Sequence, residues 1–146
     1  MQNLTLKYDG DTLALGATLA EVVVPGDIIA LTGDLGAGKT TLARGLIHAL
    51  CGEIEVPSPT YTLVQMYDTP KGEIWHCDMY RLEQPRDAYE LGLIEAFDTA
   101  ICLIEWPDKL GELLPDNCLS IDIGFDGEGR IARLSGWENR FDGSPI

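Results

Sequence analysis

Basic residues are scarce in this sequence. Its 146 residues include 10 Lys and Arg against 24 Asp and Glu, which gives a formal net charge of −14 at pH 7. Proteins that bind nucleic acid directly neutralise its phosphates with clustered Lys and Arg, and the sequence contains no such cluster. We therefore expect no direct binding of DNA, and we expect any RNA substrate to be held by a partner protein.

Long apolar segments and paired cysteines are missing as well. No apolar run reaches membrane-spanning length, and no basic segment followed by an apolar one occurs at the N-terminus. These absences predict a cytoplasmic protein without membrane contact. The cysteines show no C-x-x-C spacing, which indicates reduced, buried thiols rather than a zinc site or disulfides. They are Cys51, Cys77, Cys102 and Cys118.

The strongest feature that is present is the segment GDLGAGKTT at residues 33–41, which fits the phosphate-loop pattern G-x-x-x-x-G-K-[ST]. Its glycines let backbone N–H groups turn toward phosphate oxygens. Lys39 brings a positive charge to the β- and γ-phosphates, and the Thr40 hydroxyl can ligate Mg²⁺. The segment predicts a nucleotide site formed by Gly33, Asp34, Leu35, Gly36, Ala37, Gly38, Lys39, Thr40 and Thr41.

The residues around this loop predict an α/β fold in one domain spanning residues 1–146. Residues 28–32 form an apolar run typical of a buried strand, and residues 41–50 have the pattern of an amphipathic helix. We expect a P-loop NTPase-like, three-layer fold with a mainly parallel central sheet and a C-terminal β-hairpin. Further strands are predicted at 4–7, 62–67, 73–78, 100–104, 119–125 and 130–134, and further helices at 12–23, 85–97 and 108–114.

Three local signals complete this outline. Asp11 is a suitable N-cap for the first helix. Pro57 and Pro59 disfavour both helix and sheet, so residues 53–61 are expected to form an ordered loop. Residues from about 138 onward carry little pattern, and we expect a loose tail there.

Two acidic residues follow apolar strands closely enough to complete a hydrolytic site. Glu105 follows the apolar run 101–104, and Asp78 ends the strand predicted at 73–78. Ligands of such sheets bind at the carboxyl ends of parallel strands. If both strands run parallel to 28–32, both carboxylates reach the phosphate side. We favour Glu105 as the magnesium-side carboxylate and Asp78 as the group that positions water or senses the γ-phosphate.

Other side chains are candidates for supporting roles. Thr60 lies in a Ser-Pro-Thr-Tyr turn. Its hydroxyl could contact Mg²⁺ or the γ-phosphate, as residues of switch loops do. The alternative is that Pro57 and Pro59 only give the connecting loop its shape and that Thr60 has no direct role. Trp106 is either a core aromatic or an exposed interaction platform, and we favour the functional surface role. His76 is expected to pack or to form a structural hydrogen bond, and His48 is expected at the surface.

Four motifs in chain order resemble one protein family. They are GDLGAGKTT at 33–41, SPTYT at 58–62, HCDMYR at 76–81 and EWP at 105–107. Together they make the sequence similar to the TsaE family, bacterial ATPases required for threonylcarbamoyladenosine modification of tRNA. The resemblance covers residues from about 10 to 135.

This resemblance implies an activity and partners. It implies an Mg²⁺-dependent ATPase, weak by itself, that acts on a complex of TsaB and TsaD, of which TsaD transfers the threonylcarbamoyl group to tRNA. ATP and Mg²⁺ are the implied cofactors, and tRNA would be reached only through the partner complex. The resemblance also implies site residues: Thr40 and Glu105 at Mg²⁺, 36–41 at the nucleotide, Asp78 and Trp106 as functionally important, and Thr12 with Arg133 or Arg130 near the adenine.

Two alternatives to this function stay open on the sequence alone. A small-molecule kinase uses the same kind of loop, but it usually clamps phosphates with several arginines, and the six arginines here are spread along the chain. A nucleotide-gated binding module with little turnover is the second alternative. GTPase activity is not expected, because no N-K-x-D guanine-specificity segment follows the loop.

Overall fold

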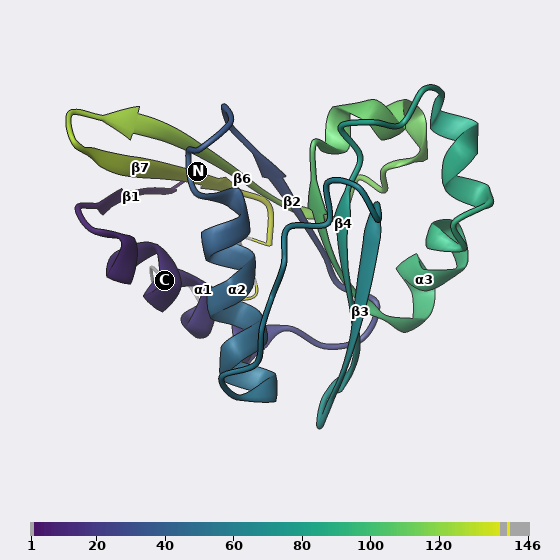
Figure 1. Ribbon diagram of the computed structural model, residues 1–146, viewed down its shortest axis with the longest axis horizontal. Coiled ribbons are helices and arrows are strands. Elements are labelled where there is room, and N and C mark those ends of the chain that lie inside the picture. Colours follow the sequence, from purple (N-terminus) through teal and green to yellow (C-terminus); the bar gives the residue numbers. More distant parts are fainter. Residues whose placement is uncertain (1, 138–139, 141–146) are drawn as a thin grey trace.

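Seven strands form one sheet in the order β1-β7-β6-β2-β5-β4-β3 (Figure 1). The computed structural model describes residues 2–137 and residue 140. The strands are β1 (Gln2–Leu6), β2 (Ile28–Thr32), β3 (Val64–Thr69), β4 (Gly72–Asp78), β5 (Ile101–Glu105), β6 (Leu119–Asp126) and β7 (Gly129–Ser135). The α-helices are α1 (Asp9–Val22), α2 (Lys39–Cys51) and α3 (Leu93–Thr99), and the 3₁₀ segments are η1 (Pro85–Tyr89) and η2 (Pro107–Leu113).

The sheet is parallel in its centre and antiparallel toward both edges. Strand β2 pairs in parallel with β5 and β6, and β5 pairs in parallel with β4. The pairs β1–β7, β6–β7 and β3–β4 are antiparallel. The C-terminal hairpin is confirmed, but the expected mainly parallel sheet holds only for the centre. A tight hairpin necessarily pairs its two strands antiparallel, which accounts for β3–β4 and β6–β7, and the N-terminal strand β1 adds antiparallel to β7 at the other edge.

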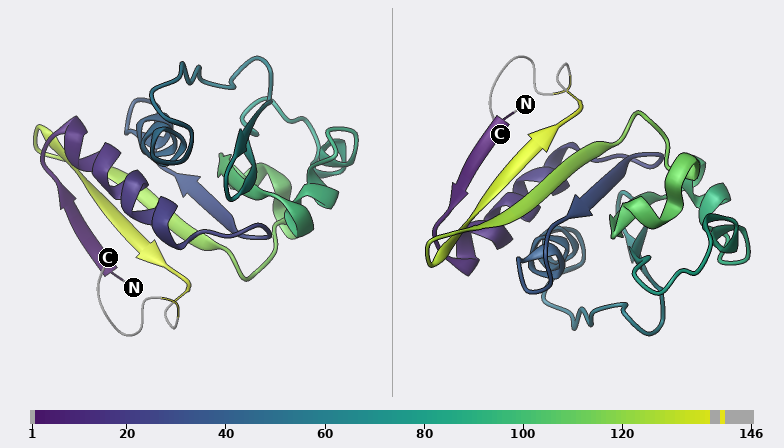
Figure 2. Two further views of the ribbon diagram at one scale, coloured as in Figure 1. Left: turned by 90° about the horizontal axis from the view of Figure 1, so that it is seen from below. Right: turned by 90° about the horizontal axis from the view of Figure 1, so that it is seen from above.

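Side-chain alternation along the central strands produces three layers. On β5, Ile101 and Leu103 belong to the core that packs against α1 and α2, whereas Cys102 and Ile104 belong to the core shared with α3, η1 and η2. Successive residues of a strand point to opposite faces, so a central strand covered on both faces is apolar throughout. Figure 2 shows α2 and α3 on opposite sides of the central strands. The predicted three-layer fold is therefore confirmed.

Helices α1 and α2 approach each other at two glycines. A Cβ atom on Gly16 would lie 2.3 Å from the carbonyl oxygen of Leu42, and one on Gly45 would lie 2.3 Å from that of Leu13. The two helix backbones are therefore in direct contact (Figure 1). Because α2 begins at the phosphate loop, this contact fixes the direction in which α2 leaves the loop.

Two predicted elements differ from the structure. Helix α1 begins at Asp9 rather than after Asp11, and the Asp11 carboxylate instead accepts a hydrogen bond of 2.9 Å from the backbone N–H of Tyr8. The helix predicted at 85–97 is interrupted: η1 ends at Tyr89 and α3 starts after Gly92. Gly92 has φ = 77°, a left-handed conformation that ends regular helical hydrogen bonding.

The C-terminal tail is only partly described. The prediction of a loose tail from about residue 138 concerns residues 138–139 and 141–146, which lie outside the described residues. Arg140 itself makes two hydrogen bonds to the Asp27 carboxylate, at 2.8 and 2.9 Å. Among the described helices, none has the length and apolar character needed to cross a membrane.

The α1–α2 contact leads to a stability prediction. We expect Gly16→Ala to lower the free energy of unfolding by about 2 kcal/mol or more, because the added methyl group meets rigid backbone atoms. Gly10 is a matched control on the same helix, with nothing within 4 Å of its Cβ position. Gly10→Ala should raise stability by roughly 0.5–1 kcal/mol. Urea unfolding followed by circular dichroism measures both, and equal effects would contradict the close helix contact.

The cysteines give a second prediction. All four are free; Cys77 and Cys102 are fully buried, and burial raises the pKa of Cys77 well above its usual value and that of Cys102 to about 12. The thiolate is the reactive form of cysteine. At pH 8, a thiol whose pKa is about 12 is present as thiolate in only about 10⁻⁴ of the molecules. We expect alkylation followed by mass spectrometry to label the half-buried Cys118 first in the folded protein. Labelling of Cys77 or Cys102 at the Cys118 rate would contradict the packing.

Candidate nucleotide site

The phosphate-loop segment connects the end of β2 to the start of α2. Gly33 and Gly38 have φ values of 138° and 117°, which side-chain-bearing residues rarely adopt. A Cβ on Gly33 would also lie 2.3 Å from the carbonyl oxygen of Ile123 on β6. These two glycines allow the chain to turn tightly between the sheet and the helix, and the helix N-terminus then faces the loop.

Lys39 is the buried cation of the site, with 5% of its surface exposed. Its Nζ donates hydrogen bonds to the carbonyl oxygens of Gly33 and Asp34, and it lies 4.4 Å from the centroid of the Trp106 ring. Burial lowers the pKa of Lys39, and the nearby carboxylates Glu105, Asp78, Asp34 and Asp122 oppose that shift. The lysine therefore carries its charge in a partly desolvated position among acidic groups.

A cavity of about 260 Å³ opens beside Lys39. Within the cavity wall, Lys39 is the one basic side chain, and it faces two carboxylates from different strands. The wall consists of Leu35, Gly36, Gly38, Lys39, Thr40, Thr41, Ser58, Thr60, Asp78, Glu105 and Trp106. Of the residues predicted for the nucleotide site from the loop, Gly33, Asp34 and Ala37 do not line it, although the first two hold Lys39 through their carbonyl groups.

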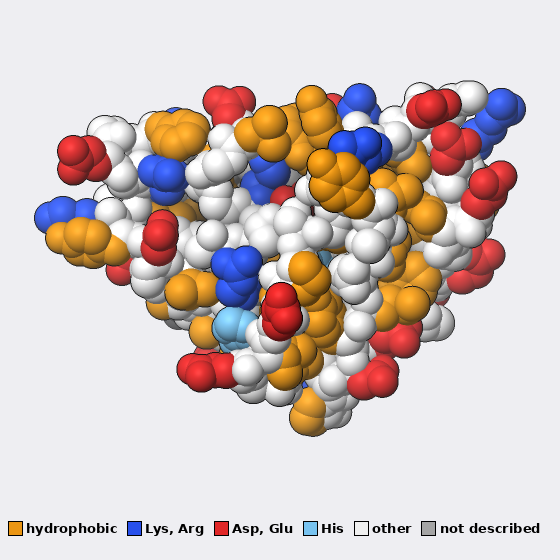
Figure 3. Space-filling model, in the orientation of Figure 1, with side chains coloured by type: hydrophobic (Ala, Val, Ile, Leu, Met, Phe, Trp, Pro, Cys, Tyr) orange, Lys and Arg blue, Asp and Glu red, His pale blue; other side chains and the backbone are white. Residues whose placement is uncertain are grey.

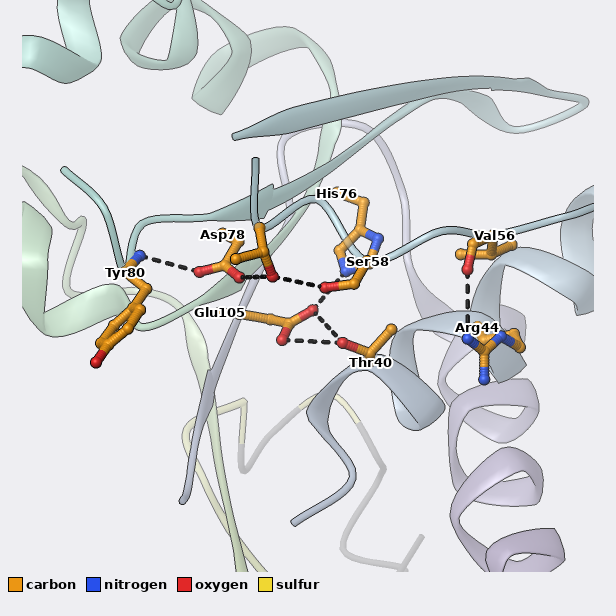
Figure 4. A network of polar contacts seen from close by, with 9 residues as sticks. Thr40, Arg44, Val56, Ser58, His76, Asp78, Tyr80 and Glu105 are labelled. Atoms are coloured by element: carbon orange, nitrogen blue, oxygen red, sulfur yellow. Dashed lines mark hydrogen bonds and ion pairs between the residues drawn. The ribbon is translucent and has the colours of Figure 1, made fainter. Parts of the chain in front are cut away.

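Glu105 joins the loop helix to the sheet (Figure 4). The Thr40 hydroxyl lies 3.1 Å from Oε1 and 3.0 Å from Oε2 of Glu105, so its hydrogen is shared between the two oxygens. His76 Nε2 lies 2.7 Å from the same Oε2. Glu105 is 3% exposed and His76 is fully buried. A buried carboxylate requires such partners, because leaving it unpaired in the interior is costly.

Asp78 is held by a second chain of hydrogen bonds. The Thr60 hydroxyl donates to Oδ2 at 3.1 Å, and the Tyr80 backbone N–H donates to Oδ1 at 2.9 Å. Ser58 Oγ is 2.9 Å from Thr60 Oγ1. Because the Thr60 hydrogen points to Asp78, Ser58 is the donor in that contact. The loop at 58–60 is therefore attached to the end of β4 through the Asp78 carboxylate.

The sheet explains why both carboxylates reach the loop. Strands β4 and β5 run parallel to β2, and Asp78 lies directly opposite Glu105 in their register. Both side chains extend from the face of the sheet that carries α2, following Leu103 on β5 and His76 on β4. The prediction that the two acidic residues reach the phosphate-loop side of the sheet is confirmed.

Trp106 is half-buried and packs against the core shared with α3, η1 and η2, so it fits neither a fully buried core position nor a fully exposed one. Its φ of 57° is left-handed, and its ring lies 4.9 Å from that of Tyr80. Three further residues of the sequence motifs are exposed: Leu35, Tyr61 and Tyr80, with 71%, 82% and 46% of their surfaces accessible. Figure 3 shows hydrophobic side chains gathered over the upper middle of the visible face, next to Lys and Arg.

Of the two arginines considered for the adenine, Arg130 contacts the loop. Its Nε donates to the carbonyl oxygen of Ala37 at 3.1 Å, and Nη2 donates to that of Gly36 at 3.3 Å. Arg133 instead pairs with Asp122 at 3.3 Å. Thr12 is buried on α1, and a Cβ on Gly38 would lie 3.7 Å from its methyl group. An adenine contact by Thr12 or Arg133 stays a prediction.

Three contacts of the site were not foreseen from the sequence. The structural hydrogen bond expected of His76 goes to the site carboxylate itself, Ser58 supports Thr60, and Arg130 binds loop carbonyls. One signal was available for His76: it lies two residues before Asp78 on a strand, and such residues share a face. The other histidine, His48, is half-buried and contacts the carbonyl oxygen of Ile54 at 2.8 Å.

The oxygen atoms of Thr40 and Glu105 suit a hard cation. Mg²⁺ is usually bound through one or two protein oxygens together with phosphates and water, rather than by a complete protein cage. The described residues contain no cluster of three or more His, Cys, Asp or Glu side chains able to hold a metal ion. The two oxygen donors therefore fit Mg²⁺ that would arrive together with a nucleotide.

The fold and the loop define a P-loop NTPase-like α/β protein. A family model described as "Threonylcarbamoyl adenosine biosynthesis protein TsaE" matches residues 6–132. The chain belongs to the TsaE family.

Similar proteins and one solved structure agree with this family. The tRNA threonylcarbamoyladenosine biosynthesis protein TsaE of Rickettsia bellii (strain RML369-C) is 38% identical over 132 residues, covering 89% of this chain and 92% of that protein. The protein of the same name from Haemophilus influenzae is 37% identical, covering 92% of this chain and 90% of that one. The crystal structure of Bacillus subtilis YdiB aligns with a TM-score of 0.78 and 31% identity, covering 97% of this chain and 88% of that chain.

The two arginines allow a direct test. We expect Arg130→Gln to weaken binding of fluorescent mant-ADP about tenfold, because hydrogen bonds from a charged donor to the loop are lost. Arg133→Gln removes the same charge three residues along β7 and should change affinity less than about twofold, because Arg133 is paired with Asp122 at the surface. A larger loss for Arg133→Gln would favour Arg133 as the nucleotide contact.

Proposed function

We propose that this protein is an Mg²⁺-dependent ATPase that supports threonylcarbamoyladenosine modification of tRNA. One observation carries the hydrolytic part of the proposal. Lys39 and Thr40 at the start of α2 and the carboxylates Asp78 and Glu105 at the ends of β4 and β5 line one cavity. This is the combination of phosphate-binding loop, metal-side acid and water-positioning group that nucleotide hydrolysis requires.

The proposed phosphate contacts come from the loop backbone and Lys39. Loop N–H groups and the N-terminus of α2 favour an anion, and the lysine adds a full charge. Lys39 is now bound to two loop carbonyls and lies over Trp106. A phosphate oxygen would offer it a charged acceptor instead of neutral ones, and hydrogen bonds to charged groups are the stronger kind.

Thr40 and Glu105 are the residues that would hold Mg²⁺. When bound, the ion would neutralise charge on the β- and γ-phosphates. The Thr40 hydroxyl and the Glu105 carboxylate already lie 3.0–3.1 Å apart, so both oxygens are within reach of one position. Adenine selectivity is part of the proposal and is supported by the family and by the absence of a guanine-specificity motif.

Asp78 and Thr60 are proposed to act at the γ-phosphate. Asp78 is 4% exposed, and each of its carboxylate oxygens accepts a hydrogen bond that fixes its orientation. A fixed carboxylate suits a group that positions water. Thr60 connects that carboxylate to the loop at 53–63. A hydroxyl in this position can couple the presence of the γ-phosphate to the loop conformation, as switch segments do.

The proposed partners are TsaB and TsaD, with tRNA reached only through their complex. The related proteins are named for tRNA threonylcarbamoyladenosine biosynthesis. The net charge of −14 disfavours direct contact with an RNA backbone. Trp106, which lines the cavity and lies 4.9 Å from the tilted ring of Tyr80, is the proposed link between the nucleotide site and a partner surface.

Reconstitution tests this function. The assay contains TsaB, TsaD, tRNA and threonylcarbamoyl-adenylate, and it follows ATP hydrolysis and repeated rounds of tRNA modification. We expect Lys39→Ala to lower both rates about 100-fold or more, as loss of a single electrostatic contact to the reacting group typically does. Lys7→Ala is the matched control, because Lys7 is exposed and lies outside the cavity wall.

The possible outcomes separate the functions. Phosphate release that depends on Lys39 and is stimulated by TsaB and TsaD supports the proposal. A phosphorylated acceptor in place of free phosphate would identify a kinase. Partner affinity that depends on ATP against ADP, with negligible turnover, would identify a nucleotide-gated binding module. Undiminished multiple-turnover modification with Lys39→Ala would overturn the proposed role.

A further inference from the structure

His76 lies between the apolar residues on the α2 side of the sheet and the two carboxylates at the strand ends. Ile74 on the same strand and Ile101 and Leu103 on β5 belong to the core beneath α1 and α2. His76 lies directly opposite Leu103 and is fully buried. An aliphatic side chain would suit this environment, and a buried polar group costs free energy unless it is hydrogen-bonded. Packing alone therefore does not explain why a histidine occupies this position.

The hydrogen bond from His76 to Glu105 supplies the reason. Nε2 lies 2.7 Å from Oε2 of Glu105, and Nδ1 has no hydrogen-bond partner among the described residues. A carboxylate accepts, so Nε2 carries the hydrogen. An Nδ1–H would be a buried donor without an acceptor, so the tautomer with its single hydrogen on Nε2 fits the site. Within the described part of the chain, the imidazole has one polar contact, and that contact is with the Glu105 carboxylate.

The two donors to Glu105 differ in what else they can do. The Thr40 hydroxyl is shared between Oε1 and Oε2 and is itself a candidate metal ligand. His76 is buried behind Glu105 and does not line the cavity. It can therefore keep its bond to Oε2 while Thr40 changes partner. Oε1, which receives only the shared Thr40 contact, is the oxygen left for a ligand on the cavity side.

We propose that His76 is a positioning residue that holds the Glu105 carboxylate in the orientation needed for Mg²⁺. This inference rests on the proposed function, because it assumes that Glu105 is the magnesium-side acid. Mg²⁺ demands nearly ideal octahedral geometry, so a carboxylate that must first be ordered binds it less well. Loss of a group that orients a metal ligand typically lowers metal affinity 10–100-fold.

The test measures how strongly the metal and the nucleotide assist each other. Binding of mant-ADP is titrated in EDTA and across a range of Mg²⁺ concentrations, and Mn²⁺ binding to the ADP complex is followed by electron paramagnetic resonance. We expect His76→Leu to weaken the metal affinity of the ADP complex about 10–100-fold and to leave ADP affinity in EDTA within about twofold. His76→Gln, whose amide nitrogen can replace Nε2–H, should retain metal affinity within about threefold of the unmodified protein.

Two further variants complete the design. His48→Leu removes the chain's other histidine, which contacts Ile54 outside the cavity wall, and should leave the metal affinity unchanged. Glu105→Ala removes the carboxylate itself. If the unmodified protein shows no metal-dependent ADP binding, or Glu105→Ala leaves it unchanged, the magnesium assignment of the proposed function fails. If Glu105→Ala abolishes it and His76→Leu preserves it, only the role of His76 is overturned.

The unmodified protein gives an independent readout, which matters if His76→Leu does not fold. Nitrogen NMR of the His76 side chain reports the hydrogen on Nε2 directly. We expect the Nε2–H to persist in all states and its resonance to shift on addition of Mg²⁺ to the ADP complex, with a smaller change on ADP alone. A resonance indifferent to Mg²⁺, or a hydrogen located on Nδ1, would overturn the proposal. Equal loss of metal affinity in His76→Gln and His76→Leu would also overturn it.

Discussion

The parallel pairing of β2, β5 and β4 is the constraint on which the candidate site depends. It directs the carboxyl ends of three strands to one edge of the sheet, with Asp78 opposite Glu105 in register. The loop after β2 and the helix α2 then complete the same edge. A one-residue slip of β4 against β5 would turn Asp78 and His76 to the other face and bring apolar side chains into the site.

Hydrogen bonds across this edge of the sheet offset the cost of burying three charged side chains. Two carboxylates and a lysine are buried close together, and each would be costly alone. Glu105 is satisfied by Thr40 and His76, Asp78 by Thr60 and a backbone N–H, and Lys39 by loop carbonyls. The polar contacts connect α2, β4, β5 and the loop at 53–63. A change at any one of these groups therefore alters the partners available to the others.

The site could be predicted from the sequence where the local pattern determines the geometry. The phosphate loop has a fixed spacing, and an acid that follows an apolar strand must lie at the strand end, so Asp78 and Glu105 were placed correctly. The contacts of His76 and Arg130 depend on register between distant strands, which local periodicity does not contain. The prediction of one continuous helix at 85–97 was wrong for another reason. Gly92 takes a left-handed conformation that interrupts the helix, although the surrounding sequence has a helical pattern.

Net charge and the local field of the site act over different distances. Exposed charges are screened within about 8 Å at physiological ionic strength, whereas buried pairs are screened much less. The charge of −14 therefore governs encounters with other macromolecules, whereas Lys39 and the loop N–H groups would govern binding at the proposed phosphate site. An acidic protein can in this way attract a nucleotide at one buried position while its surface disfavours RNA. That separation is consistent with the proposed function, in which this protein acts only on the nucleotide and its partners hold the tRNA.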